Sequence, residues 1–207
     1  MPYKKDRKRL VRARMAETGE NYTQALTALL GEQALDPLPD GWFLAGTRPA
    51  EYAAGLLSPA AAYEGERVMR LRFRATAAPG GFGAVMQSFD AARYRGGRVR
   101  LSAMIRGEEV SNWAGAWLRI DAGARSQGLD NMSDRPLRGS TGWAQADCVL
   151  DVGPDATSVH FGVLLAGAGA IDLARPRFEA VDGTVAVTRT PGRVLAAGPR
   201  SLNFGAA

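Results

Sequence analysis

Residues 113–143 read WAGAWLRIDAGARSQGLDNMSDRPLRGSTGW, and they hold three of the four tryptophans of this 207-residue chain. In the first part of this stretch, Ala116, Leu118 and Ile120 are separated by larger or polar residues, beginning with Trp117. An alternation with a period of two predicts a β-strand that buries one of its faces. The remainder is rich in Asn, Asp, Arg and Gly, which predicts a long polar loop after the strand.

The same alternation recurs in several segments that are separated by turns rich in Gly and Pro. These segments are 41–46, 69–74, 84–89, 99–106, 144–152, 159–165 and 171–181. Residues 48–55 lack the pattern, and we expect a loop there. About eight half-buried strands with no helix between them predict an antiparallel sandwich, because a parallel sheet needs long crossovers that are usually helical. We therefore expect a mainly β protein, and a jelly-roll β-sandwich is the preferred architecture.

Basic residues dominate the first 14 positions, which hold seven Lys or Arg residues and one Asp. The seven are Lys4, Lys5, Arg7, Lys8, Arg9, Arg12 and Arg14. The whole chain has a formal net charge of +5, so the rest of it is close to neutral. Such a block of charge attracts nucleic acid, an anionic surface or an acidic partner. We expect these seven residues to bind nucleic acid or an acidic partner, with no membrane partner; a solvated face is the alternative.

Two short helices are predicted in the N-terminal segment. Residues 4–17 contain neither Gly nor Pro, and Gly19 suits the position after a helix end. A second helix is expected to end at Gly31, which makes a small basic hairpin of the helix–turn–helix type. The prolines and acidic residues of 32–40 indicate a linker. The expected regions are the hairpin over 1–35, the β-sandwich over 36–182 and an extended C-terminal tail over 183–207.

The composition also predicts a compartment. A single cysteine excludes an internal disulfide and fits a reducing environment. No apolar run approaches the ~20 residues that a membrane-spanning helix needs, and no apolar segment of a signal peptide follows the N-terminus. We expect a cytoplasmic protein.

The sequence shows no catalytic or metal-binding motif. His160 is the only histidine, on the polar side of a predicted strand, and Cys148 falls on the apolar side of another. A zinc site needs several Cys or His ligands, so we expect neither metal nor cofactor. An acidic calcium site formed by Asp121, Asp130 and Asp134 stays open as an alternative, although the spacing of these residues matches no calcium-binding loop. We therefore expect a protein that is not an enzyme.

A binding face is the better-supported kind of site. Trp117 and Arg119 share the strand face that points away from the predicted core. An outward tryptophan beside an arginine forms a stacking platform for a flat ligand. Five further residues are expected to supply polar contacts around this platform: Arg48, Tyr52, Gln87, Asn131 and Arg135. The alternative is that the other tryptophans cap the ends of the sandwich and that the loop residues, Arg135 included, pair locally.

Several segments carry a resemblance to known domains. They are GWFLAGTRPAEYAAG at 41–55, FGAVMQSFDAARYRGGRVRLSAMIR at 82–106, WAGAWLRID at 113–121, DNMSDRPLRGSTGW at 130–143 and HFGVLLAGAG at 160–169. The body of the chain is similar to β-sandwich domains of bacterial regulatory proteins, including AraC-type transcriptional regulators. At the level of fold it resembles galactose-binding-like and carbohydrate-binding jelly rolls. The resemblance implies a non-enzymatic domain that binds an effector or a partner. In contrast to an AraC-type regulator, only the basic hairpin stands where a DNA-binding domain would be.

The leading expectation is a regulatory binding protein. Its sandwich recognises a small molecule or a protein partner, and its hairpin engages nucleic acid or an acidic partner. Two alternatives are a carbohydrate-binding module and a structural or assembly subunit. An enzyme that uses a pair of carboxylates is a further alternative. An oligomer is compatible with each of these functions.

Overall fold

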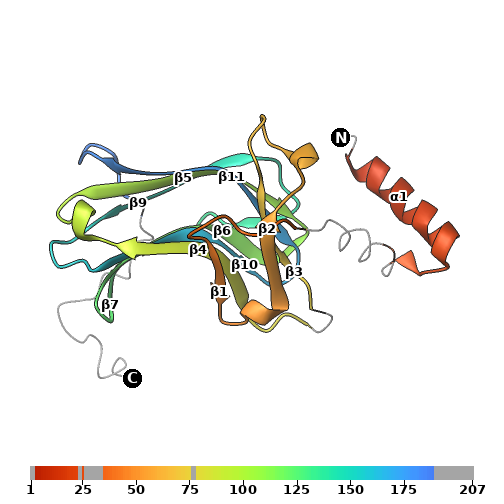
Figure 1. Ribbon diagram of the computed structural model, residues 1–207, viewed down its shortest axis with the longest axis horizontal. Helices are drawn as coiled ribbons and strands as arrows, with labels where there is room; N and C mark the ends of the chain where they lie inside the picture. The colour runs from red at the N-terminus through yellow and green to blue at the C-terminus, as the bar shows by residue number, and fades with distance from the viewer. Residues whose placement is uncertain (1–2, 23–24, 26–34, 76–77, 189–207) are drawn as a thin grey trace, which may run out of the picture.

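The computed structural model describes residues 3–22, 25, 35–75 and 78–188. The described chain is mainly β, with two antiparallel sheets packed face to face and one short N-terminal helix (Figure 1). This confirms the predicted fold class. Figure 1 shows the helix, α1, apart from the two sheets.

Each sheet places strands beside each other that are far apart in the sequence. The six-stranded sheet has the order β1 (Phe43–Gly46), β4 (Phe82–Asp90), β10 (Ser158–Ala166), β6 (Val110–Ala122) and β7 (Arg125–Asp130), and β8 (Leu137–Gly139) also pairs with β6. The five-stranded sheet has the order β2 (Tyr52–Leu56), β3 (Met69–Phe73), β11 (Ala170–Val181), β5 (Arg98–Glu108) and β9 (Ala144–Asp151). Short 3₁₀ turns are η1 (Pro49–Glu51), η2 (Pro59–Ala61) and η3 (Ala92–Tyr94). Because the chain crosses repeatedly between sheets, the topology is of the jelly-roll kind.

The core lies between the two sheets and follows the predicted alternation. Leu118 of β6 and Leu101 of β5 point into it, as do Val163 of β10 and Leu71 of β3, and all four are almost completely buried. Aromatic rings fill the core toward η3: Phe161 stacks on Phe178 with ring centroids 5.2 Å apart. The remaining rings of this cluster meet edge to face, among them those of Trp42, Phe89 and Tyr94.

Two local predictions were wrong. Residues 48–55 were expected to be a loop, but they form η1 and most of β2. This strand pairs with β3, with Tyr52 opposite Phe73, and the ring of Tyr52 packs on Gly83, where a Cβ would not fit. The polar region after β6 is also more ordered than expected, since it contains β7 and β8.

The N-terminal segment is described in part. α1 spans Tyr3–Thr18, as predicted, and Gly19 has the expected left-handed φ of +72°. The predicted second helix lies largely outside the described residues. In the part of the chain that the structure describes, no helix is long and apolar enough to cross a membrane.

The described beginning of the predicted C-terminal tail runs along the sandwich. Arg98 of β5 donates hydrogen bonds to the carbonyl groups of Gly183 and Val185. Thr188 exchanges hydrogen bonds with the backbone of Val149 at the free edge of β9. Residues 183–188 therefore cover an exposed sheet edge, a kind of site at which unwanted pairing starts.

Candidate functional site

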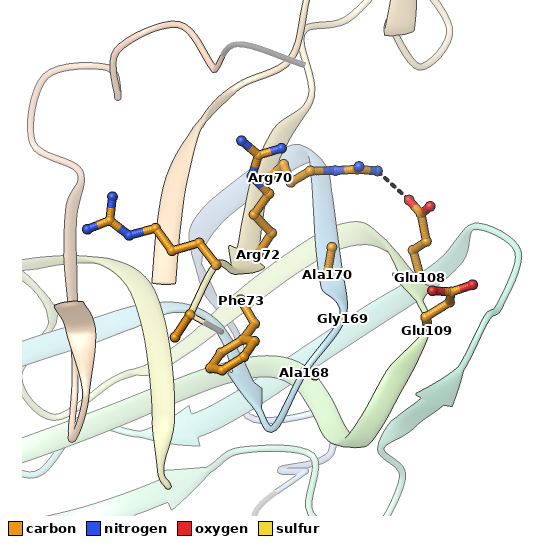
Figure 2. Close-up of a pocket in the computed structure, with 10 residues that line it drawn as sticks. Arg70, Arg72, Phe73, Glu108, Glu109, Ala168, Gly169 and Ala170 are labelled. Atoms are coloured by element: carbon orange, nitrogen blue, oxygen red, sulfur yellow. Dashed lines mark hydrogen bonds and ion pairs between the residues drawn. The ribbon is translucent and has the colours of Figure 1, made fainter. Parts of the chain in front are cut away.

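An arginine pocket of about 340 Å³ opens at one end of the five-stranded sheet (Figure 2). β3 and the residues after it supply Arg70, Arg72, Phe73, Arg74 and Ala75. The turn between β5 and β6 supplies Glu108 and Glu109, and the turn between β10 and β11 supplies Ala168, Gly169 and Ala170. Its volume lies in the range of small-molecule sites, about 300–1,000 Å³.

The row of side chains beside the pocket is a closed ion cluster. Asp172 of β11 is paired in register with Arg70 of β3 and with Arg106 of β5, so all three side chains stand on the same outer face. Arg70 Nε lies 2.7 Å from Asp172 Oδ1, and Arg106 Nε lies 3.0 Å from Asp172 Oδ2. Arg70 also donates to Glu108, at 2.9 Å. Asp172 and Arg70 are buried, so this carboxylate compensates one desolvated cation, Arg70, and also pairs with the partly exposed Arg106.

The next row, two residues further along β3, is the floor of the pocket. Here Arg72 stands opposite Ala170, and Ala170 stands opposite Glu108. The methyl group of Ala170 thus takes the place that a carboxylate holds in the row of Asp172. Burial, and then the positive charge of Arg70, lower the pKa of Arg72 from its ordinary value. The lowered pKa means that the surroundings of Arg72 disfavour its charged form relative to water.

Gly169 allows the two turns of the pocket to approach each other closely. Its φ is +105°, and a Cβ there would lie 2.5 Å from the carbonyl oxygen of Glu109 and 2.6 Å from that of Glu108. Glu109 itself has a left-handed φ of 52°. A tight contact between two backbone turns thus fixes the pair of glutamates at the rim of the pocket.

The predicted platform residues lie together on the outer face of the six-stranded sheet. Trp117 and Arg119 point away from the Leu118 side, as expected. However, Trp117 is only 7% exposed, because it packs in a second apolar cluster with Met86 and Leu164. The ring is therefore not an open stacking surface.

Polar atoms beside Trp117 are buried and have no hydrogen-bond partner among the described residues. They are Trp117 Nε1, Arg119 Nε and Asp121 Oδ1. All three belong to β6 residues that alternate on the same outer face. A buried polar atom without a partner is unusual and points to strain, a ligand or a function.

His160 of β10 is the centre of a polar cluster on this face. Its Nδ1 lies 2.8 Å from Ser88 Oγ, and its Nε2 lies 2.9 Å from Ser158 Oγ and 3.2 Å from Asp121 Oδ2. Burial, and then the charge of Arg119, lower the pKa of His160 from its ordinary value. Three different strands supply these residues, so the cluster cannot be recognised from a local sequence motif.

Four of the five predicted contact residues do not join the Trp117 face, and three of them lie on other parts of the sandwich. Gln87 is in register with Phe161 and shares the core side of the sheet, opposite to Trp117. Tyr52 is 1% exposed, and its hydroxyl oxygen lies 3.1 Å from the carbonyl oxygens of both Gly81 and Gly167, so its one proton is shared between these two acceptors. Arg48 is exposed and pairs with Glu51 in the same turn.

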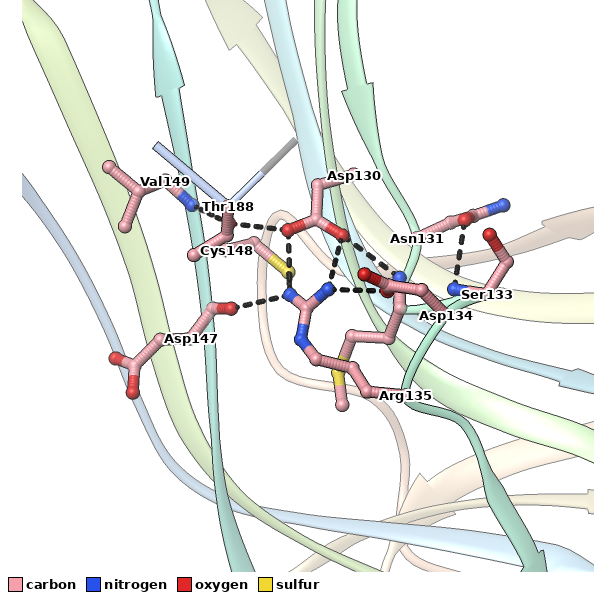
Figure 3. Close-up of polar contacts among 10 residues, drawn as sticks. Asp130, Asn131, Ser133, Asp134, Arg135, Asp147, Cys148, Val149 and Thr188 are labelled. Atoms are coloured by element: carbon pink, nitrogen blue, oxygen red, sulfur yellow. Dashed lines mark hydrogen bonds and ion pairs between the residues drawn. The ribbon is translucent and has the colours of Figure 1, made fainter. Parts of the chain in front are cut away.

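The other two predicted contacts, Asn131 and Arg135, follow β7 (Figure 3). Asn131 accepts a hydrogen bond from the backbone of Ser133. Arg135 turns toward the opposite sheet, where Asp130 binds it at 2.6 and 3.1 Å. The same guanidinium donates to the backbone carbonyl of Asp147 on β9, at 2.8 Å. The Asp130–Arg135 pair is therefore a clasp between the two sheets, and the loop does not carry Arg135 to the Trp117 face.

Two smaller predictions concern Cys148 and a calcium site. Cys148 is completely buried, as predicted, and burial raises the pKa of its thiol. The proposed calcium ligands do not meet, because Asp121 pairs with Arg119 while Asp130 and Asp134 pair with Arg135. Among the described residues, no group of three or more acidic, His or Cys side chains is placed to hold a metal ion.

Comparison with known sequences gives one named relative. No family model matches the chain. The chain is 33% identical over 186 residues to the uncharacterized HTH-type transcriptional regulator YbfP of Bacillus subtilis strain 168. The match covers 88% of this chain and 62% of the relative, so the chain spans less than two thirds of that protein.

Comparison with solved structures gives carbohydrate-binding modules and a cyclase, each with a TM-score of 0.50. The CBM22-1 xylan-binding domain of Paenibacillus barcinonensis Xyn10C is 13% identical, and the match covers 71% of this chain and 90% of that one. The C-terminal family 22 module of Clostridium thermocellum Xyn10B is 18% identical with the same coverage. The cyclase of Fischerella sp. TAU is 15% identical, covering 72% and 87%. At these identities the matches show the fold alone. They support the jelly-roll fold, while the AraC-type likeness stays a prediction.

Proposed function

We propose that the chain is the non-enzymatic, ligand-binding part of a regulatory protein. Its sandwich binds a small molecule that carries a carboxylate or phosphate group, in the arginine pocket. The observation that carries this proposal is a pocket of about 340 Å³ that is lined by three arginines of β3 and the residues after it, Arg70, Arg72 and Arg74. The regulator-named relative supports the regulatory role, and the fold shared with carbohydrate-binding modules supports a binding role. A cytoplasmic location stays a prediction.

Charge is the reason for preferring an anionic ligand. Three arginines and two glutamates line the pocket, and Asp172 and Glu108 already compensate Arg70. The guanidinium of Arg74 donates hydrogen bonds to the backbone carbonyl group of Ala50. That carbonyl group is a dipole and carries no full negative charge. A guanidinium binds carboxylate and phosphate through paired, charge-assisted hydrogen bonds.

Ligand binding to the pocket is testable by thermal shift and calorimetry. We expect at least one member of a panel of small carboxylic acids, amino acids and inorganic phosphate to raise the melting temperature of the full chain. Arg72→Gln should weaken that ligand by roughly 10- to 100-fold, the value of a charge-assisted hydrogen bond. The matched control is Arg93→Gln, at an exposed position of η3 at the opposite end of the sandwich. Equal weakening by both variants, or no ligand in the panel, would contradict the proposal.

The finer part of the proposal assigns nucleic-acid contact to α1. Lys8, Arg9 and Arg12 follow one another along this helix, and Lys4, Lys5 and Arg7 lie in its first turns. Arg14 forms an ion pair with Glu20, at 2.8 Å. Val11 is completely buried, whereas its neighbour Leu10 is 54% exposed. The helix therefore has a buried side and an exposed side, and Leu10 lies on the exposed side beside basic residues.

Salt dependence tests this contact. The logarithm of the binding constant for duplex DNA should fall linearly with the logarithm of the salt concentration, with a slope of about −0.9 for each neutralised phosphate. Replacing Lys8, Arg9 and Arg12 together by Gln should make the slope about 2.7 shallower. A triple variant with an unchanged slope would exclude these contacts. A change in sedimentation with no change in DNA binding would instead favour an assembly role for α1.

A second candidate function is carbohydrate binding on the Trp117 face. The buried, unpartnered atoms of Trp117, Arg119 and Asp121 favour it, because hydroxyl groups both donate and accept hydrogen bonds. The burial of the Trp117 ring counts against an open stacking surface. Trp117 variants separate a structural role from a binding role.

A further inference from the structure

We propose that His160 is an acid-sensitive switch on the outer face of the six-stranded sheet. When its ring takes up a proton from solvent, Asp121 exchanges Arg119 for the imidazolium, and Arg119 turns toward water. This inference goes beyond the proposed function, because it requires neither a ligand in the arginine pocket nor DNA on α1. The switch lies on the Trp117 face, where the second candidate function places a carbohydrate.

One carboxylate lies between two basic side chains on this face. Arg119 of β6 and His160 of β10 stand opposite each other on neighbouring strands, and Asp121 is two residues further along β6. The same oxygen, Asp121 Oδ2, lies 2.9 Å from Arg119 Nη2 and 3.2 Å from His160 Nε2. While the ring is neutral, this carboxylate compensates Arg119 alone. A positive charge on His160 therefore competes with Arg119 for the same oxygen.

Two serines hold the ring of His160 in a manner that suits both protonation states. Ser88 Oγ lies 2.8 Å from Nδ1, and Ser158 Oγ lies 2.9 Å from Nε2. A serine hydroxyl group both donates and accepts hydrogen bonds. One serine thus donates to the unprotonated nitrogen of the neutral ring, and both serines accept from the imidazolium. Protonation therefore changes the charge of the ring without displacing it.

Arg119 is the side chain that leaves when the two cations compete. Its side chain is 41% exposed, whereas those of His160 and Asp121 are 16% and 13% exposed. The Nε of Arg119 is buried and has no hydrogen-bond partner among the described residues, so the ion pair rests on Nη2. A guanidinium that turns into water keeps its hydration, while a largely buried imidazolium needs a carboxylate beside it. Asp121 therefore stays with His160 in acid.

The neighbouring strands set the charge around the ring. A further carboxylate on this face is that of Asp90 on β4, which is opposite Ser158 and accepts a hydrogen bond from the backbone of Ala92. On the other side, beyond Arg119, β7 brings the apolar Leu129. Burial, and then the charge of Arg119, lower the pKa of His160, and Asp121 opposes them. The neutral ring is therefore the form in the fold at pH 7.

Urea denaturation at several pH values is the first test. The unfolded chain titrates near the ordinary histidine pKa of about 6.5, and the fold lowers this pKa. The stability that the neutral ring contributes is therefore complete above about pH 6.5 and is lost as the pH falls through the folded pKa. The urea midpoint of the unaltered chain should fall more on acidification than that of His160→Gln, whose amide hydrogen-bonds the serines but takes up no proton. An equal fall in both proteins would overturn the switch.

NMR titration follows the ring directly, because His160 is the only histidine in the chain. Arg119→Gln should raise the midpoint of the ring and Asp121→Asn should lower it, each by at least about 0.5 pH unit. Arg100→Gln is the control and should leave the midpoint unchanged, since Arg100 pairs with Glu179 on the outer face of the other sheet. Midpoints that neither variant moves would show that these charges do not act on the ring.

The exchange of partners is read from the Nε–H signal of Arg119. This signal is assigned by its absence from the ¹⁵N spectrum of Arg119→Gln. It should shift with the same midpoint as the ring in the unaltered chain and stay in place over the same pH range in His160→Gln. A ring that titrates while the Arg119 signal does not move would overturn the switch.

Discussion

Asp130→Ala is expected to lower the free energy of unfolding by about 3 kcal/mol, the lower end of the range for breaking a buried ion pair. Asp130 is completely buried, and its carboxylate accepts hydrogen bonds from Arg135, from the backbone of Met132 and from Thr188. The alanine variant removes all of these bonds together. In this variant, Arg135 keeps its ion pair with Asp134 and its hydrogen bond to the carbonyl group of Asp147. The expected loss of stability is therefore at the lower end of that range.

The position of the clasp explains the size of the effect. Asp130 ends β7 at the edge of one sheet, and Asp147 belongs to β9 at the edge of the other. Burial alone lowers the pKa of Arg135, but the hydrogen bonds and charges of Asp130 and Asp134 raise it above its ordinary value. The guanidinium therefore stays charged between the sheets, and loss of Asp130 leaves this charge poorly compensated.

Urea denaturation measures this effect, with a control on the same strand. Arg125 of β7 pairs with Asp155, and both side chains are more than half exposed. Arg125→Ala should therefore change the free energy of unfolding by less than about 1 kcal/mol. If Asp130→Ala costs no more than this control, the clasp does not hold the sheets together. In a double-mutant cycle, Asp130→Ala and Arg135→Ala should be strongly non-additive, because they remove the same interaction.

The sequence predicts the sandwich because each half-buried strand carries its own alternation. Leu71 on one side and Arg70 and Arg72 on the other are enough to define the two faces of β3. The strand at Tyr52 escapes prediction because small residues, Ala53, Ala54 and Gly55, give no contrast between its faces. Its assignment depends instead on pairing with β3.

The arginine pocket escapes prediction for a related reason. The alternating arginines of β3 are visible in the sequence, but their partners come from β11 and β5. A shift of β11 by two residues would place Asp172 opposite Arg72 and Ala174 opposite Arg70. Long-range register decides whether a row contains an anion, and register follows from the packing of both sheets.

The Trp117 face also shows that a local sequence pattern does not predict contacts made by distant strands. Alternation correctly places Trp117 away from the main core. Its burial comes from Met86 and Leu164, which β4 and β10 bring to the same outer face. Gly162 lies between Trp117 and Met86 in register and adds no side chain there. A local pattern gives the direction of a side chain but not what covers it.

Trp117→Ala is accordingly expected to cost roughly 3–5 kcal/mol of the free energy of unfolding, the usual range for removing a large buried aromatic ring. The loss combines the apolar area of the indole with the cavity left between Met86 and Leu164. Urea denaturation is again the measurement. Leu129→Ala on β7 is the control, because Leu129 is 42% exposed and should cost less than about 1 kcal/mol. If the loss of unfolding free energy for Trp117→Ala is as small as for this control, the indole ring contributes little packing energy.

Trp117→Phe separates packing from recognition at the same position. Phenylalanine keeps most of the apolar contact and removes the indole N–H, which is buried and has no partner among the described residues. Removing an unsatisfied donor costs nothing in hydrogen bonding, so we expect a much smaller loss of stability than for alanine. If the N–H serves a carbohydrate ligand, Trp117→Phe should instead weaken binding of xylohexaose or another oligosaccharide about tenfold or more at nearly unchanged stability. No oligosaccharide binding by the unaltered chain would leave Trp117 as packing alone and the arginine pocket as the site of recognition.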